Sequence, residues 1–143
     1  MVDQGVTDPS PRPAAFKLAA GMTLLVGALS ASLGSAHLYG VSVTANLKGY
    51  TYDFRLAALY IVGMAIVAGG VLCLVAVRAL ASANRMGLER GIYGTVLLLV
   101  CIPLRPIQPE LAGGLTTVGI VNLIVLLGVA LATRHEAGRG SVR

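Results

Sequence analysis

Long uninterrupted runs of apolar residues dominate the hydrophobic and polar pattern of this chain. The segments without any Asp, Glu, Lys or Arg are 18–47, 56–77, 91–104 and 111–133. An α-helix needs about 20 apolar residues to cross the ~30 Å hydrocarbon core of a bilayer. The pattern therefore predicts an all-α integral membrane protein that folds as a bundle of four transmembrane helices.

Polar residues and prolines between these runs set the expected limits of each helix. We expect helices over about 14–38, 54–81, 87–104 and 113–133. They would form one membrane domain, 14–133, between a flexible tail 1–13 that contains alternating prolines and a second flexible tail, 134–143. Within the long loop after the first helix, the segments 41–44 and 50–52 have a β-type pattern that is compatible with a small hairpin.

The third helix is the shortest of the four. Its uncharged part, 91–104, covers only about 21 Å at ~1.5 Å per residue, so a tilted or re-entrant segment is an alternative to a full crossing. Arg90 and Arg105 have long aliphatic stems, which let their charges reach the interface while the neighbouring residues stay buried.

The distribution of basic residues favours four crossings. Four crossings place eight basic residues on one side, Arg12, Lys17, Arg78, Arg85, Arg90, Arg134, Arg139 and Arg143. The other side then holds only Lys48, Arg55 and Arg105. Lys and Arg accumulate on the cytoplasmic side of membrane proteins. We therefore expect both termini to be cytoplasmic, in a multi-pass protein of a bacterial cytoplasmic membrane. The small residues 34–36 leave cleavage of the first helix open.

Overall composition agrees with a membrane protein and argues against a separate soluble domain. Hydrophobic residues make up 56% of the chain and charged residues 12%, against about 25% charged in soluble domains. The net charge of +5 is spread over several loops, so it indicates membrane topology and contact with lipids, not nucleic-acid binding.

Few polar side chains fall inside the predicted spans. Asn122 lies at the centre of the fourth, where an amide needs a hydrogen-bond partner. Ser30, Ser32, Thr95 or a backbone carbonyl could supply it, and the same residues could instead form a polar contact for a substrate or an ion inside the bundle.

Small residues recur at helical spacing and predict close helix packing, within this bundle or against a partner. The stripes are Gly27, Ala31 and Ser35; Ala65, Gly69 and Cys73; and Gly87, Gly91 and Thr95.

Aromatic and charged residues gather just before the second helix. Tyr50, Tyr52, Asp53, Phe54 and Arg55 form the candidate partner-docking segment, because aromatic residues and Arg are enriched at protein interfaces. Asp53 could alternatively cap the second helix.

No catalytic, cofactor-binding or metal-binding constellation is visible. His37 and His135 are expected at opposite ends of the bundle, and Cys73 and Cys101 at opposite depths. We therefore expect no enzyme and no cofactor. The expected function is that of a non-catalytic accessory or stabilising subunit of a larger bacterial membrane complex, with other membrane subunits or further copies of itself as partners. The alternative is a small oligomeric transporter or lipid-handling protein.

Overall fold

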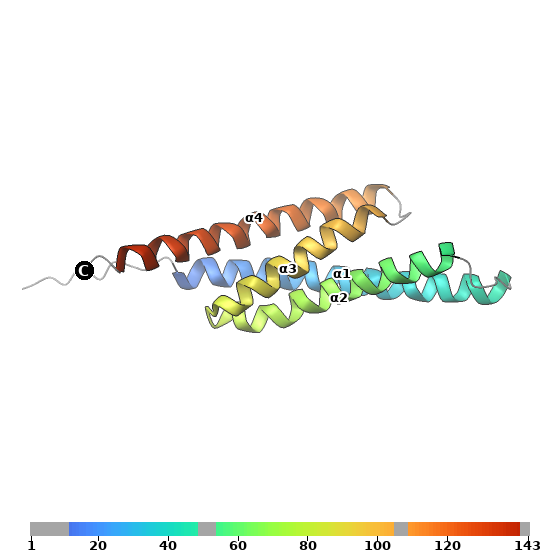
Figure 1. Cartoon of the computed structure of the whole chain (residues 1–143), viewed down its shortest axis with the longest axis horizontal. Helices are drawn as coiled ribbons and strands as arrows, with labels where there is room; N and C mark the ends of the chain where they lie inside the picture. The colour runs from blue at the N-terminus through green and yellow to red at the C-terminus, as the bar shows by residue number, and fades with distance from the viewer. Residues whose placement is uncertain (1–11, 49–53, 105–108, 141–143) are drawn as a thin grey trace, which may run out of the picture.

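The structure, a computed structural model, describes residues 12–48, 54–104 and 109–140, with side chains over 14–47, 54–103 and 113–134. The described part is all-helical. Its elements are α1 (Arg12–Lys48), α2 (Phe54–Ala81), α3 (Arg85–Cys101), the 3-10 turn η1 (Ile102–Leu104) and α4 (Pro109–Gly140). The helices form an elongated assembly in which the start of α1, the α2–α3 turn and the end of α4 lie toward the same end (Figure 1). We call this the basic end, and the opposite end the distal end.

Three helices are long and apolar enough to cross a membrane: Ala14–Leu47, Phe54–Ala81 and Gly113–Arg134. Helices of this length and apolar composition match the hydrocarbon thickness and indicate a membrane protein. α3 has 17 residues and is the shortest of the four helices.

α1 extends well past the end near 38 that its sequence predicted. It continues to Lys48 and has 37 residues, so the expected β-type segment 41–44 is helical. Ser42 and Thr44 donate to carbonyls of their own helix, at Leu38 (2.9 Å) and Gly40 (2.8 Å). Val41 packs into the interior. Tertiary packing thus overrides the low helix propensity of this stretch. The other half of the expected hairpin, 50–52, lies outside the described residues.

The remaining helix limits also differ from the expected ones. α3 covers Arg85–Cys101 and tightens into η1 before Leu104, in place of a helix over 87–104. α4 runs from Pro109 to Gly140, so the expected tail 134–143 is helical as far as residue 140. α1 starts at Arg12, inside the expected tail 1–13, whose earlier residues lie outside the described part.

α1 and α2 pack closely through glycines. A Cβ atom built on Gly70 would lie 2.7 Å from the backbone nitrogen of Ala31 and 3.0 Å from the carbonyl oxygen of Gly27. Gly34 is equally tight against Val67. Small residues of this kind let two backbones approach where lipid provides no hydrophobic drive for association.

The neighbouring glycine of α2 serves the opposite interface. A Cβ atom on Gly69 would meet Leu98 at 2.9 Å, and one on Gly94 would meet the Gly69 carbonyl oxygen at 2.9 Å. Consecutive residues of a helix point about 100° apart. The Gly69-Gly70 pair therefore lets α2 approach α3 on one face and α1 on another.

The predicted small-residue stripes largely face these interfaces. Gly27, Gly69 and Cys73 are buried, as are Gly87, Gly91 and Thr95 of α3. Ser35 is exposed, because the packed face of α1 passes through Gly34 instead.

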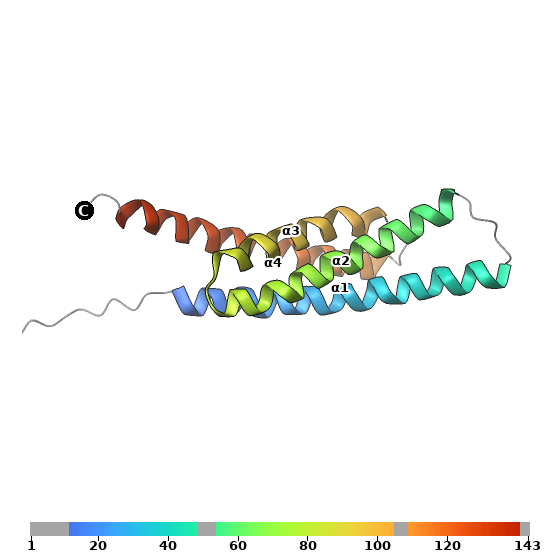
Figure 2. The same cartoon turned by 60° about the horizontal axis from the view of Figure 1, so that its bottom comes forward.

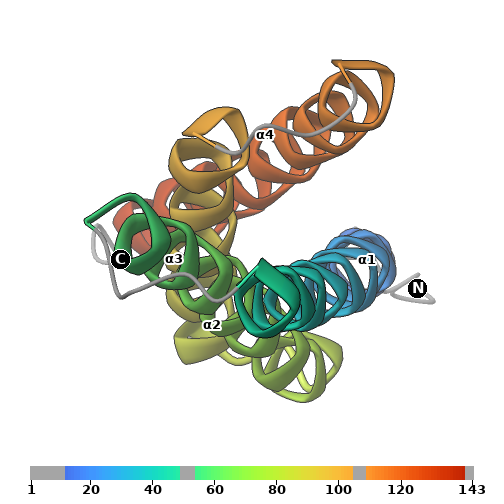
Figure 3. The same cartoon turned by 90° about the vertical axis from the view of Figure 1, so that its right-hand side faces the viewer.

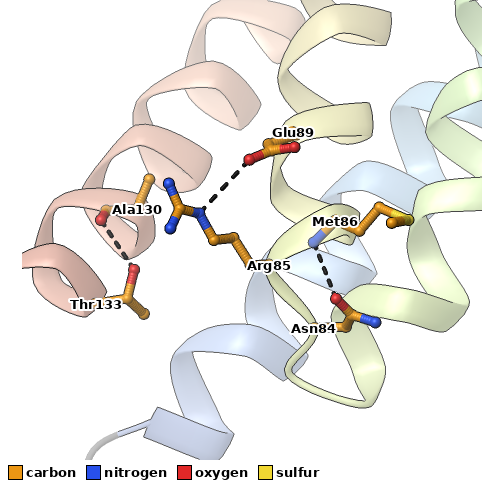
Figure 4. Close-up of polar contacts among 6 residues, drawn as sticks. All are labelled: Asn84, Arg85, Met86, Glu89, Ala130 and Thr133. Atoms are coloured by element: carbon orange, nitrogen blue, oxygen red, sulfur yellow. Dashed lines mark hydrogen bonds and ion pairs between the residues drawn. The ribbon is translucent and has the colours of Figure 1, made fainter. Parts of the chain in front are cut away.

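A tight turn connects α2 to α3. Ala83 has φ of 53°, and Asn84 caps α3 by accepting a hydrogen bond from the Met86 backbone N–H at 3.0 Å (Figure 4). Asn is a favoured N-cap because its side-chain oxygen satisfies a backbone donor that the helix leaves free.

The apolar interior has two parts along the long axis. Near the basic end, residues of all four helices form one cluster: Phe16, Ala19, Ala20, Ala76, Leu80, Leu88, Leu126 and Val129. Toward the distal end, α1, α2, α3 and η1 form a second: Val26, Ile66, Cys73, Leu98, Cys101 and Ile102.

α1 and α2 continue beyond the ends of α3 and α4 at the distal end (Figures 1 and 2). Viewed along the long axis, α1 and α2 lie side by side while α4 diverges from α1 (Figure 3). The distal part of the α1–α2 pair, residues 36–48 and 54–61, is called the overhang below.

Candidate functional site: a polar layer between the apolar clusters

Each of the four helices contributes one polar or sulfur-containing side chain to a single buried layer. The four residues are Thr23 of α1, Cys73 of α2, Thr95 of α3 and Asn122 of α4, and each has an exposed fraction of 0%. The layer lies between the two apolar clusters, with Cys73 at the border of the distal one. We call it the polar layer.

The hydrogen bonds of the polar layer form a chain in which Thr23 donates to Asn122, and Asn122 donates to Thr95. Thr95 Oγ1 donates to the Gly91 carbonyl oxygen at 2.7 Å, so its lone pairs accept from Asn122 Nδ2 at 2.9 Å. Thr23 Oγ1 donates to Asn122 Oδ1 at 3.1 Å. The Cys73 thiol lies 3.8 Å from Thr95 Oγ1 and acts as a weak donor there. Asn122 thus links α4 to α1 and α3 simultaneously.

Sequence reasoning identified only part of this layer. The predicted polar contact included Asn122 and Thr95, which the structure brings together, but neither Thr23 nor Cys73, which was predicted only as part of a small-residue stripe. Ser32, which was also named, is exposed on α1 and does not join the layer. The signal that could have located Thr23 is its heptad spacing from Ser30 and His37, since residues seven apart share a helix face.

Thr23, Ser30 and His37 form a polar column on the interior face of α1, with exposed fractions of 0%, 1% and 8%. At about 1.5 Å per residue, successive members lie ~10 Å apart. Ser30 Oγ is buried and has no hydrogen-bond partner among the residues that the structure describes.

His37 is buried between α1 and α2, in the distal part of α1. Its Nε2 donates to the Leu59 carbonyl oxygen at 3.1 Å. Gly63 makes room for the ring, because a Cβ atom there would lie 2.8 Å from His37 Cδ2. Farther along the overhang, Tyr60 donates to Ser42 at 2.9 Å. Both contacts hold α1 against α2.

Only part of the candidate docking segment can be placed. Phe54 and Arg55 are exposed in the first turn of α2, at the tip of the overhang. Tyr50, Tyr52 and Asp53 lie outside the described residues, as does any capping role of Asp53.

The polar layer is suited to fixing the register of α1, α3 and α4, because displacing any one of these three helices would leave a buried hydroxyl or amide without a partner. Comparisons of this chain with protein-family models, with curated proteins and with solved structures found no match, so its function is inferred from its own residues.

Proposed function

We propose that the protein is a non-catalytic accessory subunit that stabilises a larger complex in a bacterial cytoplasmic membrane. The unequal lengths of its packed helices carry this proposal. α1 has 37 residues, about 56 Å of helix, whereas α3 has 17 residues, about 26 Å. One bilayer with a hydrocarbon core of ~30 Å cannot match both.

Tilting does not remove the mismatch. The uncharged part of α1, 18–47, is about 45 Å long and needs a tilt of roughly 50° to fit ~30 Å, beyond the ~0–40° seen for membrane helices. A bilayer that fits α3 therefore leaves much of the overhang outside the hydrocarbon.

Large apolar side chains are exposed along the overhang. The exposed fractions are 74% for Tyr39, 82% for Leu47 and 86% for Phe54. Such side chains outside the hydrocarbon favour contact with another protein. The occupant that fits an apolar, helical surface just above a membrane is another subunit of the same membrane complex.

The proposed topology has four crossings and cytoplasmic termini. Arg78, Arg85, Arg90 and Arg134 lie in the described helices toward the basic end, together with Lys17, and the positive-inside tendency assigns this end to the cytoplasm. The proposed four crossings are supported by the positions of α1 and α4, because α1 begins and α4 finishes at the same end (Figure 1).

The test is native mass spectrometry of the full chain, extracted from its own membranes in mild detergent. We expect a defined complex heavier than the chain with its lipids. The double variant Leu47→Ala/Phe54→Ala should lose this complex. The matched control Ile124→Ala/Leu131→Ala, on an exposed face of α4, should keep it. A lone chain in the unaltered protein would refute the accessory role.

A second candidate function, a small oligomeric transporter or lipid-handling protein, is favoured by one observation. The buried Ser30 hydroxyl without a partner among the described residues offers one free polar contact inside the helices. Asn122 and Thr95, in contrast, are already hydrogen-bonded to each other. The accessory role is therefore the better supported of the two.

A further inference from the structure

Exposed cations of three helices lie at a similar height, next to the polar layer on the side of the basic end. Lys17 of α1, Arg78 of α2 and Arg90 of α3 each lie five or six residues from the polar-layer residue of their own helix, about 8–9 Å along its axis. All three side chains are exposed. Arg85 and Arg134 lie farther toward the basic end and are exposed too.

Apolar side chains follow these cations on the same exposed surface. Next to Lys17 comes Leu18 with an exposed fraction of 61%, and one turn from Arg78 comes Val75 with 51%. On α3, Arg90 is followed at the next turn by Tyr93 with 70%, and then by Val96. Cation, amphipathic ring and aliphatic residue in this order are typical of a helix that passes from headgroups into hydrocarbon.

Acidic partners are scarce around these cations. Within the described residues the one ion pair joins Arg85 Nε to Glu89 Oε1 at 3.5 Å (Figure 4). Lys17, Arg78, Arg90 and Arg134 have no ion pair there. Cations at the boundary of the hydrocarbon that have no ion pair among the described residues are complementary in charge and depth to lipid phosphates, and guanidinium groups bind phosphate oxygens in a bidentate manner.

We propose that the basic collar, formed by Lys17, Arg78 and Arg90 and extended toward the basic end by Arg134, is a binding surface for the headgroups of anionic phospholipids. The collar holds the chain at a fixed depth, with the polar layer inside the hydrocarbon. This role concerns the isolated chain and does not depend on a protein partner.

The test measures lipid binding to the purified full chain in neutral detergent. Phosphatidylglycerol and phosphatidylcholine are titrated separately, and bound lipid is counted by native mass spectrometry alongside the unfolding temperature. We expect phosphatidylglycerol to bind roughly tenfold more tightly, since each Lys or Arg near an anionic surface adds to the attraction. A phosphatidylglycerol preference below twofold would overturn the proposal.

Two matched triple variants test whether the preference for phosphatidylglycerol depends on the basic collar. Lys17→Gln/Arg78→Gln/Arg90→Gln should abolish the preference for phosphatidylglycerol. Lys48→Gln/Arg55→Gln/Arg105→Gln removes the same charge from outside the collar and should preserve it. Equal loss in both variants would show that net charge, and not the collar, attracts the lipid, and would overturn the proposal.

Two further measurements use the unaltered chain, in case the first triple variant does not fold. About 0.5 M NaCl should weaken the preference, because salt screens exposed charges. Inorganic phosphate should not raise the unfolding temperature as phosphatidylglycerol does. A preference that is insensitive to salt, or an equal rise with phosphate, would contradict a lipid-headgroup surface.

Discussion

At the scale of single residues, the side chain of Asn122 connects three helices. Its amide accepts from Thr23 and donates to Thr95, and all three side chains have no access to solvent. Buried polar groups of this kind reduce stability little while they are hydrogen-bonded, but removing one partner leaves the other desolvated and unpaired, which destabilises the protein. The sequence identified Asn122 as a polar residue in an apolar segment, but only the packing of four helices reveals which hydroxyl groups reach it.

We expect Asn122→Leu to reduce the free energy of unfolding by about 1–2 kcal/mol, because it leaves the hydroxyl of Thr23 without its acceptor and removes a donor to Thr95. The measurement is denaturant or thermal unfolding in detergent. Thr117→Val is the control, since that exposed α4 hydroxyl bonds only to its own helix at Gly113 (2.9 Å).

The double variant Thr23→Val/Asn122→Leu separates a shared hydrogen bond from two independent losses. The double variant should lose less stability than the sum of the losses in the two single variants, since both substitutions remove the same bond. Ser30→Ala is the contrasting change, and it should not destabilise the protein because its hydroxyl has no partner to lose among the described residues. Strict additivity would contradict a Thr23–Asn122 interaction.

At the scale of helices, glycine positions decide how closely the elements approach. Gly69 and Gly70 face α3 and α1 respectively, whereas a Cβ atom on Gly21 of α1 would point into open space, with no atom within 4 Å. Sequence spacing indicated that small residues mediate packing. On α1 it placed Gly27 and Ala31 correctly but gave Ser35 in place of Gly34 as the third position, because the rotation of the helix is set by the partner helix.

Gly70→Ala should destabilise the protein by roughly 1–3 kcal/mol, because the added methyl group would press on the backbone of α1 at Ala31 and Gly27. Gly21→Ala is the matched control and should be neutral or stabilising by up to ~1 kcal/mol, since alanine favours helix and the position is open. Thermal unfolding of both variants in the same detergent gives the comparison. A Gly70→Ala protein as stable as Gly21→Ala would refute close α1–α2 contact.

At the scale of the whole molecule, the decisive feature is the difference in length between α1–α2 and α3. The sequence placed the end of the first helix too early, because Gly40, Ser42, Val43 and Thr44 have low helix propensity. Packing of Val41 and the contacts of His37 and Tyr60 with the other helix continue α1 to Lys48. The overhang therefore depends on contacts between α1 and α2, which the sequence of α1 alone does not reveal.

Single-cysteine labelling tests the proposed four crossings. Ser82→Cys and Ala132→Cys should react with a membrane-impermeant maleimide only after permeabilisation, whereas Asn46→Cys should react in intact cells. All three positions are exposed, and the native Cys73 and Cys101 are buried. Labelling of position 132 from the outside, with position 82 still protected, would show that α3 does not cross.

The sequence by itself determined that this chain is helical and suited to a membrane, because uncharged runs of sufficient length have few other stable environments. It also marked the basic residues that flank each run. Only the tertiary structure decided that Thr23, Cys73, Thr95 and Asn122 share one layer, and that α1 extends beyond the end of α3. Both depend on the rotation and register of one helix against another, which follow from contacts between residues far apart in the chain.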